Sequence, residues 1–165
     1  MGFMRSWLVV VALGLLMELP PSNLAAANRA DIVGAATVLD DGSLRIGNRI
    51  IRMYGIYIVP TRQICSTFSR PVRCGGRAAV ALETKIQGFV FCHSVGVYAD
   101  GSVSAVCYIR RTFRSAGEDL AAYLLAEGWA LALPGAPFEY FAMERIAQTR
   151  KLGLWGFPAD VITFR

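Results

Sequence analysis

Residues 32–54 read IVGAATVLDDGSLRIGNRIIRMY, and they carry the clearest strand pattern in the chain. Apolar and β-branched residues fill three short runs, at 32–39, 44–46 and 50–54, and polar, glycine-containing breaks separate them. The first break is an Asp-Asp-Gly sequence and the second is Gly-Asn, compositions that are typical of tight turns between antiparallel strands. The stretch therefore predicts a three-stranded meander.

Two more strands follow after a loop and a helix. Residues 57–75 contain two prolines and read as the loop, whereas residues 77–87 carry apolar side chains every four positions and read as the helix. Residues 89–97 and 103–109 are β-rich, and an Asp-Gly turn lies between them. Five strands with a helix after the third follow the order of an OB-fold barrel.

Two helices complete the expected domain. Ser115 and Glu118 fit the capping-box pattern at the start of the second helix, and Gly128 suits its C-terminal end. The third helix is expected at 137–152, with Phe141 and Ile146 among the side chains that face the core. The fold class is therefore α+β, a five-stranded OB-fold β-barrel with three helices.

The N-terminal residues have the composition of an export signal. Arg5 precedes an almost wholly apolar stretch at 6–17, which is too short to span a bilayer comfortably, and small residues follow at 25–27. We expect a signal peptide at 1–27, a domain at 28–165 and a periplasmic or secreted protein. An uncleaved N-terminal anchor is the alternative; after cleavage no later segment is long enough for a stable membrane span.

Charge and cysteine content agree with export. The formal net charge of +5 permits an anionic partner such as nucleic acid, acidic polysaccharide or a membrane surface, but does not require one. An even number of cysteines in an exported chain favours two disulfides, and we favour the two local pairings, Cys65 with Cys74 and Cys92 with Cys107. A zinc site is the alternative, but the chain has no C-x-x-C and a single histidine.

Several short segments stand in a suggestive order: Asp41-Gly42-Ser43-Leu44, residues 51–56 (IRMYGI), Cys74-Gly75-Gly76-Arg77, residues 106–108 (VCY), residues 124–132 (LLAEGWALA) and residues 152–155 (LGLW). Their order and spacing resemble the motifs of the staphylococcal nuclease (thermonuclease) family, including its exported, cysteine-bearing members. The resemblance implies the same five-stranded OB barrel with three helices. It also implies an ancestral calcium-dependent hydrolysis of DNA and RNA.

Most of the charged residues that this reaction requires are absent at the matching positions. Ser43 stands where the family has a metal-binding aspartate, Tyr57 where it has a second, and Thr61 where it has the general base. Ser102 replaces one of the two arginines that stabilise the transition state, so that Arg52 alone is retained. Because losing one such donor typically costs about 10²–10³ in rate, the resemblance implies a degenerate active site.

Three hypotheses for function follow. The first is an exported pseudonuclease that is not an enzyme, has no cofactor and binds an anionic or polymeric ligand, nucleic acid or acidic polysaccharide. Some exported nuclease-like proteins carry names linked to exopolysaccharide or succinoglycan production, and the resemblance extends that accessory role to this chain. The hypothetical ligand-binding residues are Arg52, Tyr54, Tyr57 and Arg62.

The second hypothesis is an active calcium-dependent phosphodiesterase with relocated residues. Asp40 and Asp41 are then the metal candidates, with Asp100 as a further ligand, although aspartates in such turns normally bond nearby backbone N–H groups. The third is a structural domain that binds another periplasmic protein. Convergence of four arginines on one concave face would favour ligand binding over a merely solvated surface; they are Arg45, Arg49, Arg52 and Arg62.

Overall fold

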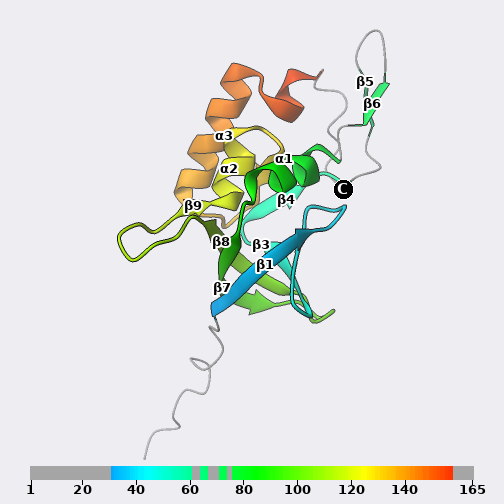
Figure 1. Ribbon diagram of the computed structural model, residues 1–165. Coiled ribbons are helices and arrows are strands. Elements are labelled where there is room, and N and C mark those ends of the chain that lie inside the picture. Colours follow the sequence, from blue (N-terminus) through cyan, green and yellow to red (C-terminus); the bar gives the residue numbers. More distant parts are fainter. Residues whose placement is uncertain (1–30, 61–63, 67–70, 74–75, 158–165) are drawn as a thin grey trace, which may run out of the picture.

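The barrel is built from five strands and closes on itself. The structure is a computed structural model that describes residues 31–60, 64–66, 71–73 and 76–157. Its barrel strands are β1 (Asp31–Val38), β2 (Leu44–Ile46), β3 (Arg49–Met53), β7 (Phe89–Val97) and β8 (Val103–Ile109). Neighbouring strands are antiparallel in the order β3-β2-β1-β7-β8, and a parallel β3–β8 pairing closes the ring. The OB-fold-like architecture predicted from the sequence is confirmed (Figure 1).

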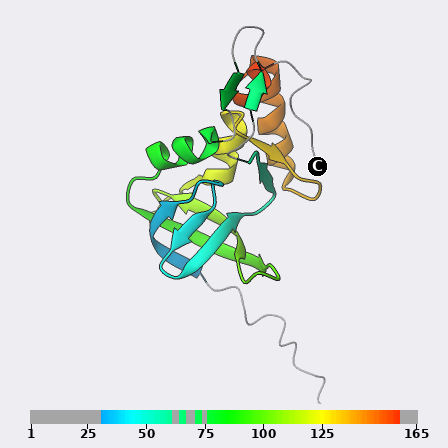
Figure 2. The same cartoon turned by 90° about the vertical axis from the view of Figure 1, so that its right-hand side faces the viewer.

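Three helices lie together above one end of this barrel, as both views show (Figures 1 and 2). They are α1 (Arg77–Lys85), α2 (Leu120–Ala126) and α3 (Phe138–Arg150), and the 3-10 helix η2 (Gly153–Gly156) follows α3. Five short strands complete the described part of the chain. β4 (Ile56–Ile58) pairs with β10 (Ala130–Ala132), and β5 (Ile64–Ser66) pairs with β6 (Pro71–Arg73). β9 (Glu118–Asp119) lies beside β8.

The core joins the barrel interior to the inner faces of the helices. Side chains that alternate along the strands point inward, and those of α1 and α2 close the open end of the barrel. Its largest fully buried members are Leu44, Ile51, Leu82, Ile109, Leu120, Leu124 and Leu125. Trp129 packs against this core, and both Trp129 and Trp155 pack against a smaller cluster around Leu154.

The predicted capping box was wrong. α2 begins at Leu120, and its N-cap is Asp119, whose Oδ1 accepts hydrogen bonds from the amides of Ala121 (2.8 Å) and Ala122 (3.2 Å). Ser115 instead accepts from the Gly117 amide within the preceding loop. Its partner in the sequence pattern, Glu118, pairs with Lys85.

The end of α2 agrees with the prediction. Gly128 has φ +74°, and a Cβ there would lie 2.4 Å from the carbonyl oxygen of Leu152. Only glycine suits both the backbone conformation and this close approach.

The face that α3 buries differs from the expected one. Phe141 and Ile146 point outward, with 40% and 48% of their surface exposed. Tyr140 and Ala147 are buried instead. These two positions are seven residues apart, which places them on one side of a helix.

Cys92 and Cys107 face each other across the β7–β8 hairpin, with their sulfurs at disulfide distance (2.07 Å), which confirms this pairing. The other expected disulfide involves Cys74, which lies outside the described residues. In the part of the chain that the structure describes, no helix combines the length and the apolar character needed to cross a membrane.

Candidate ligand-binding groove

Two turns of the same sequence flank the end of the barrel where Arg52 lies. In the β1–β2 turn, Oδ1 of Asp41 accepts hydrogen bonds from the amide (2.9 Å) and hydroxyl (2.6 Å) of Ser43. In the β7–β8 turn, Oδ1 of Asp100 accepts the equivalent bonds from Ser102, at 3.0 and 2.6 Å. Each aspartate therefore fixes its own turn with one oxygen and leaves Oδ2 for another contact.

Arg52 uses that second oxygen at one of the two turns. Its guanidinium lies 2.7 Å from Oδ2 of Asp100, and it also stacks 5.2 Å from the centre of the Tyr98 ring. Hydrogen bonds from the Ser102 hydroxyl and amide, together with the Arg52 charge, hold the pKa of Asp100 below its usual value. The pair is therefore charged on both sides at neutral pH, and its charges largely cancel.

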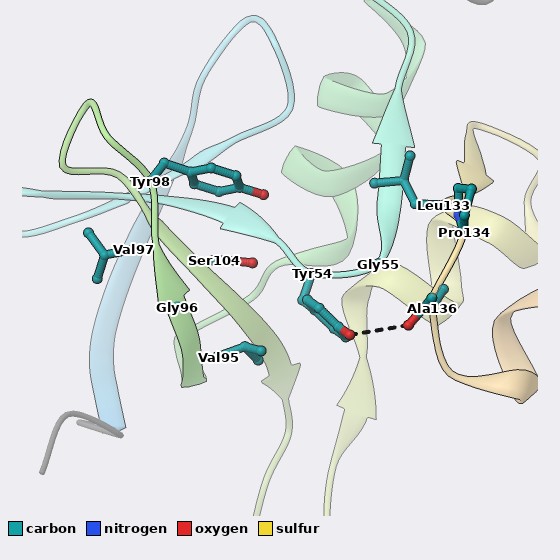
Figure 3. Close-up of a pocket in the computed structure, with 11 residues that line it drawn as sticks. Tyr54, Gly55, Val95, Gly96, Val97, Tyr98, Ser104, Leu133, Pro134 and Ala136 are labelled. Atoms are coloured by element: carbon teal, nitrogen blue, oxygen red, sulfur yellow. Dashed lines mark hydrogen bonds between the residues drawn. The ribbon is translucent and has the colours of Figure 1, made fainter. Parts of the chain in front are cut away.

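A groove runs past this ion pair. It consists of two adjoining pockets of about 300 and 450 Å³ that share Tyr98 and Leu133. We call it the tyrosine groove and define it by the lining residues that carry the argument: Arg52, Tyr54, Tyr57, Tyr98, Ser104 and Leu133. Figure 3 shows the smaller pocket, with the rings of Tyr54 and Tyr98 on the barrel side and Leu133 and Pro134 opposite them.

The opposite wall of the groove is attached to the barrel by hydrogen bonds. The Tyr54 hydroxyl donates to the carbonyl of Gly135 (3.2 Å), and the Leu133 amide donates to the carbonyl of Gly55 (2.9 Å). Gly55 has φ +77°, and a Cβ there would come within 3.3 Å of Ala136, Pro137 and Tyr140. The segment between β10 and α3 is thus fitted against the barrel before any ligand binds.

The structure brings together three of the four residues that the sequence suggested for ligand binding. Arg52 and Tyr57 line the larger pocket, and Tyr54 lines the smaller one. Arg62 lies outside the described residues. Arg45 and Arg49 are exposed but line neither pocket, so within the described chain the expected arginines do not converge on this face.

The two metal candidates lie differently with respect to the larger pocket. Asp41 lines the larger pocket, but its Oδ1 is engaged by Ser43, and Asp40 is exposed outside that lining. Among the described residues, no group of three or more His, Cys, Asp or Glu side chains is placed to hold a metal ion. A hard cation such as calcium takes six to eight oxygen ligands, so these two aspartates alone do not supply a site.

Sequence reasoning missed Tyr98, Leu133 and the role of Asp100 as the partner of Arg52. The available signal was the Asp-Gly-Ser sequence that occurs at both 41–43 and 100–102. Turns of the same sequence place an aspartate at the same point of each hairpin. No family model and no curated protein matches this chain.

Proposed function

We propose that this protein is a non-hydrolytic OB-fold binding module that takes a segment of a hydroxyl-rich polymer, an oligosaccharide of low charge, in the tyrosine groove. The observation that carries the proposal is the Arg52–Asp100 ion pair within a groove lined by tyrosines. The groove lies at the loops that join the first and second, and the fourth and fifth, barrel strands. OB folds bind oligonucleotides and oligosaccharides at these loops.

Charge separates these two ligand classes. Asp41, Arg52 and Asp100 give this end of the groove one positive and two negative charges, so a phosphate backbone would meet a net repulsion. Sugar hydroxyls both donate and accept, and the carboxylate–guanidinium pair offers acceptors and donors side by side. Tyrosine rings provide flat apolar surface for the faces of sugar rings, with a polar hydroxyl at the edge.

The family origin forms part of the proposal. The OB-like barrel and the order of the sequence motifs support descent from a staphylococcal-nuclease-type domain whose cleavage chemistry has been lost. Ser43 and Ser102, at positions where the family carries charged residues, serve here as hydrogen-bond donors within turns. An exported accessory role in exopolysaccharide production is consistent with such a module. A periplasmic protein that is itself bound to the polymer would then be a suitable partner for it.

Affinity electrophoresis tests the ligand class. The protein is run in native gels that contain a neutral β-glucan or polygalacturonate, and binding of fluorescent oligo(dT) is measured separately by anisotropy. We expect retardation by the neutral glucan, abolished by Tyr98→Ala and retained by Phe138→Ala, because Phe138 is aromatic and more exposed than Tyr98 but lies outside the groove. Tight oligo(dT) binding that depends on Tyr98, without glucan binding, would refute the proposal.

A nicking assay tests the loss of hydrolysis. Supercoiled plasmid is incubated with calcium and either the wild-type chain or the Asp41→Asn variant. We expect no cleavage above background with either protein, because Ser43, Tyr57 and Thr61 stand where the resembled family has its metal-binding aspartates and its general base. Cleavage by the wild type that disappears in Asp41→Asn would establish the alternative, an active nuclease with relocated ligands.

A further inference from the structure

The loop at residues 110–117 stands away from the barrel between β8 and β9 (Figure 1). A bridge between Thr112 and Ser115 closes it into a tight hairpin, with Phe113 and Arg114 at the tip. Phe113 is 92% exposed, the largest exposed fraction among the described large apolar side chains. A single exposed aromatic side chain is common, but one at a loop tip that adjoins further exposed apolar side chains marks a surface for a partner.

Apolar side chains of the barrel exterior continue the surface beneath this tip. Val33 on β1 lies opposite Phe91 on β7, and both line a pocket of about 520 Å³ together with Phe113. Phe89 precedes Phe91 by two residues, so it lies on the same face of β7, and it is 62% exposed. These four side chains form one apolar face outside the barrel, separate from the tyrosine groove.

Cationic groups surround this apolar face. Three arginines lie in the loop, at positions Arg110, Arg111 and Arg114. Arg111 donates a hydrogen bond to Nε2 of His93, and Nδ1 of the same ring lies 2.5 Å from Oδ1 of Asp31. The second nearby carboxylate, that of Glu118, is 3.5 Å from Arg110 and 2.7 Å from Lys85. Lys85 lines a separate pocket with Glu118 and Asp119, so three loop arginines stand beside two carboxylates at this face, and the rim keeps a small positive excess.

We propose that this apolar, arginine-rimmed face docks the domain on an anionic phospholipid surface, with Phe113 entering the boundary between headgroups and acyl chains. Interfacial segments combine apolar side chains that enter this boundary with Arg or Lys that contact the headgroups. Arg111 and Arg114 flank Phe113 in the loop, two residues before and directly after it in sequence, and their long side chains suit contact with headgroups beside an inserted aromatic ring. A free polyanion would leave the apolar centre of the face exposed to water.

The position of the face within the chain agrees with this partner. Asp31, the first described residue, lines the same pocket as Phe113. The apolar segment at 6–17, which suits insertion into a bilayer, precedes it in the sequence. Any form of the protein that keeps this segment in a membrane would therefore carry the docking face close to the bilayer.

Co-sedimentation with lipid vesicles tests the proposal. The full chain and a chain that begins at residue 28 are each mixed with phosphatidylcholine vesicles, with or without phosphatidylglycerol. Core residues of the described structure lie between Ile32 and Leu154, so the shorter chain keeps them all. We expect both chains to bind better when phosphatidylglycerol is present, and variants are compared within each background so that residues 6–17 contribute equally.

Matched variants separate the face from general charge and apolarity. Phe113→Ser should weaken binding to phosphatidylglycerol vesicles about tenfold, and Arg114→Glu, a change of two charge units, about 25-fold, from roughly fivefold for each unit of charge. Val80→Ser and Arg150→Glu change exposed residues outside this face and should leave binding unchanged. Equal losses from the control variants, or binding that ignores lipid charge, would overturn the proposal.

A fluorescent probe tests the insertion directly. Phe113→Trp should gain a blue-shifted emission on anionic vesicles relative to the wild-type chain, whose own tryptophans supply the baseline. An unshifted emission while the protein sediments with vesicles would place the contact elsewhere and refute the assignment. Binding to soluble heparin through Arg114, with no vesicle binding, would show an ordinary polyanion site instead.

Discussion

The strongest structural prediction concerns one carboxylate that joins α2 to α3. Oδ1 of Asp119 caps α2, and Oδ2 accepts a 2.6 Å hydrogen bond from the hydroxyl of Tyr140, a residue of α3 that is 2% exposed. Loss of an N-cap costs about 1 kcal/mol, and a hydrogen bond to a charged group contributes about 2 kcal/mol. Tyr140→Phe should therefore lower the free energy of unfolding by about 2 kcal/mol.

Asp119→Ala removes the cap and also leaves the buried hydroxyl of Tyr140 without its acceptor, so we expect a loss of about 3 kcal/mol. The double variant loses the same cap and the same bond, each counted once, so we again expect a loss of about 3 kcal/mol. The two single effects should thus exceed the double effect by about 2 kcal/mol. Ser115→Ala, at the capping residue that the sequence suggested, should change stability by only a few tenths of a kcal/mol.

Urea denaturation followed by tryptophan fluorescence measures all four variants. Unchanged m-values would show that the differences in midpoint are differences in stability. Additive effects of the two substitutions would refute the shared carboxylate. A larger loss from Ser115→Ala than from Asp119→Ala would restore the capping box and refute the assignment of the cap.

Three further predictions follow from the same structure. Burial and the hydrogen bond to Asp119 raise the pKa of Tyr140 above its usual value of 10.0. The unfolded chain therefore releases this proton first, and the free energy of unfolding should fall as pH rises above that value. Urea midpoints measured against pH should decrease less steeply at alkaline pH for Tyr140→Phe than for the wild type. Gly55→Ala should lower the free energy of unfolding by about 1–2 kcal/mol because of its positive φ, and it should also weaken glucan retardation. A variant with wild-type stability and wild-type retardation would contradict the close fit of this wall against the barrel. Replacing Cys92 and Cys107 together by alanine opens a loop with a sequence separation of 15 and should cost about 3 kcal/mol in urea, whereas an unchanged midpoint would argue against the disulfide.

The strands were predictable because their signals are local. Alternation and turn residues between 32 and 54 predict the meander, and the structure places β7 and β8 at the predicted 89–97 and 103–109. The errors occurred where tertiary packing selects among local alternatives. Two acidic residues, Glu118 and Asp119, were available as partners at the start of α2, and the one that also reaches Tyr140 forms the cap.

The candidate site was predictable only in part, for a related reason. Arg52, Tyr54 and Tyr57 lie near one another in the sequence, so one motif could suggest all three. The partner of Arg52 lies 48 residues away, and the opposite wall of the groove belongs to the segment before α3. Closure of the barrel by the β3–β8 pairing brings Arg52 level with Ser104, and no local pattern encodes that register.

The same β7–β8 hairpin carries both proposed surfaces, at opposite ends. β8 begins at Val103, next to the turn that holds Asp100, and ends at Ile109, next to the loop that carries Phe113. A strand of this length spans about 20 Å, so polymer in the groove and lipid at the loop would not compete for space. Tyr98→Ala should then spare vesicle binding and Phe113→Ser should spare glucan retardation, which makes each variant the control for the other. Loss of both activities from either substitution would mean that a single surface, or a general loss of folding, accounts for the two observations.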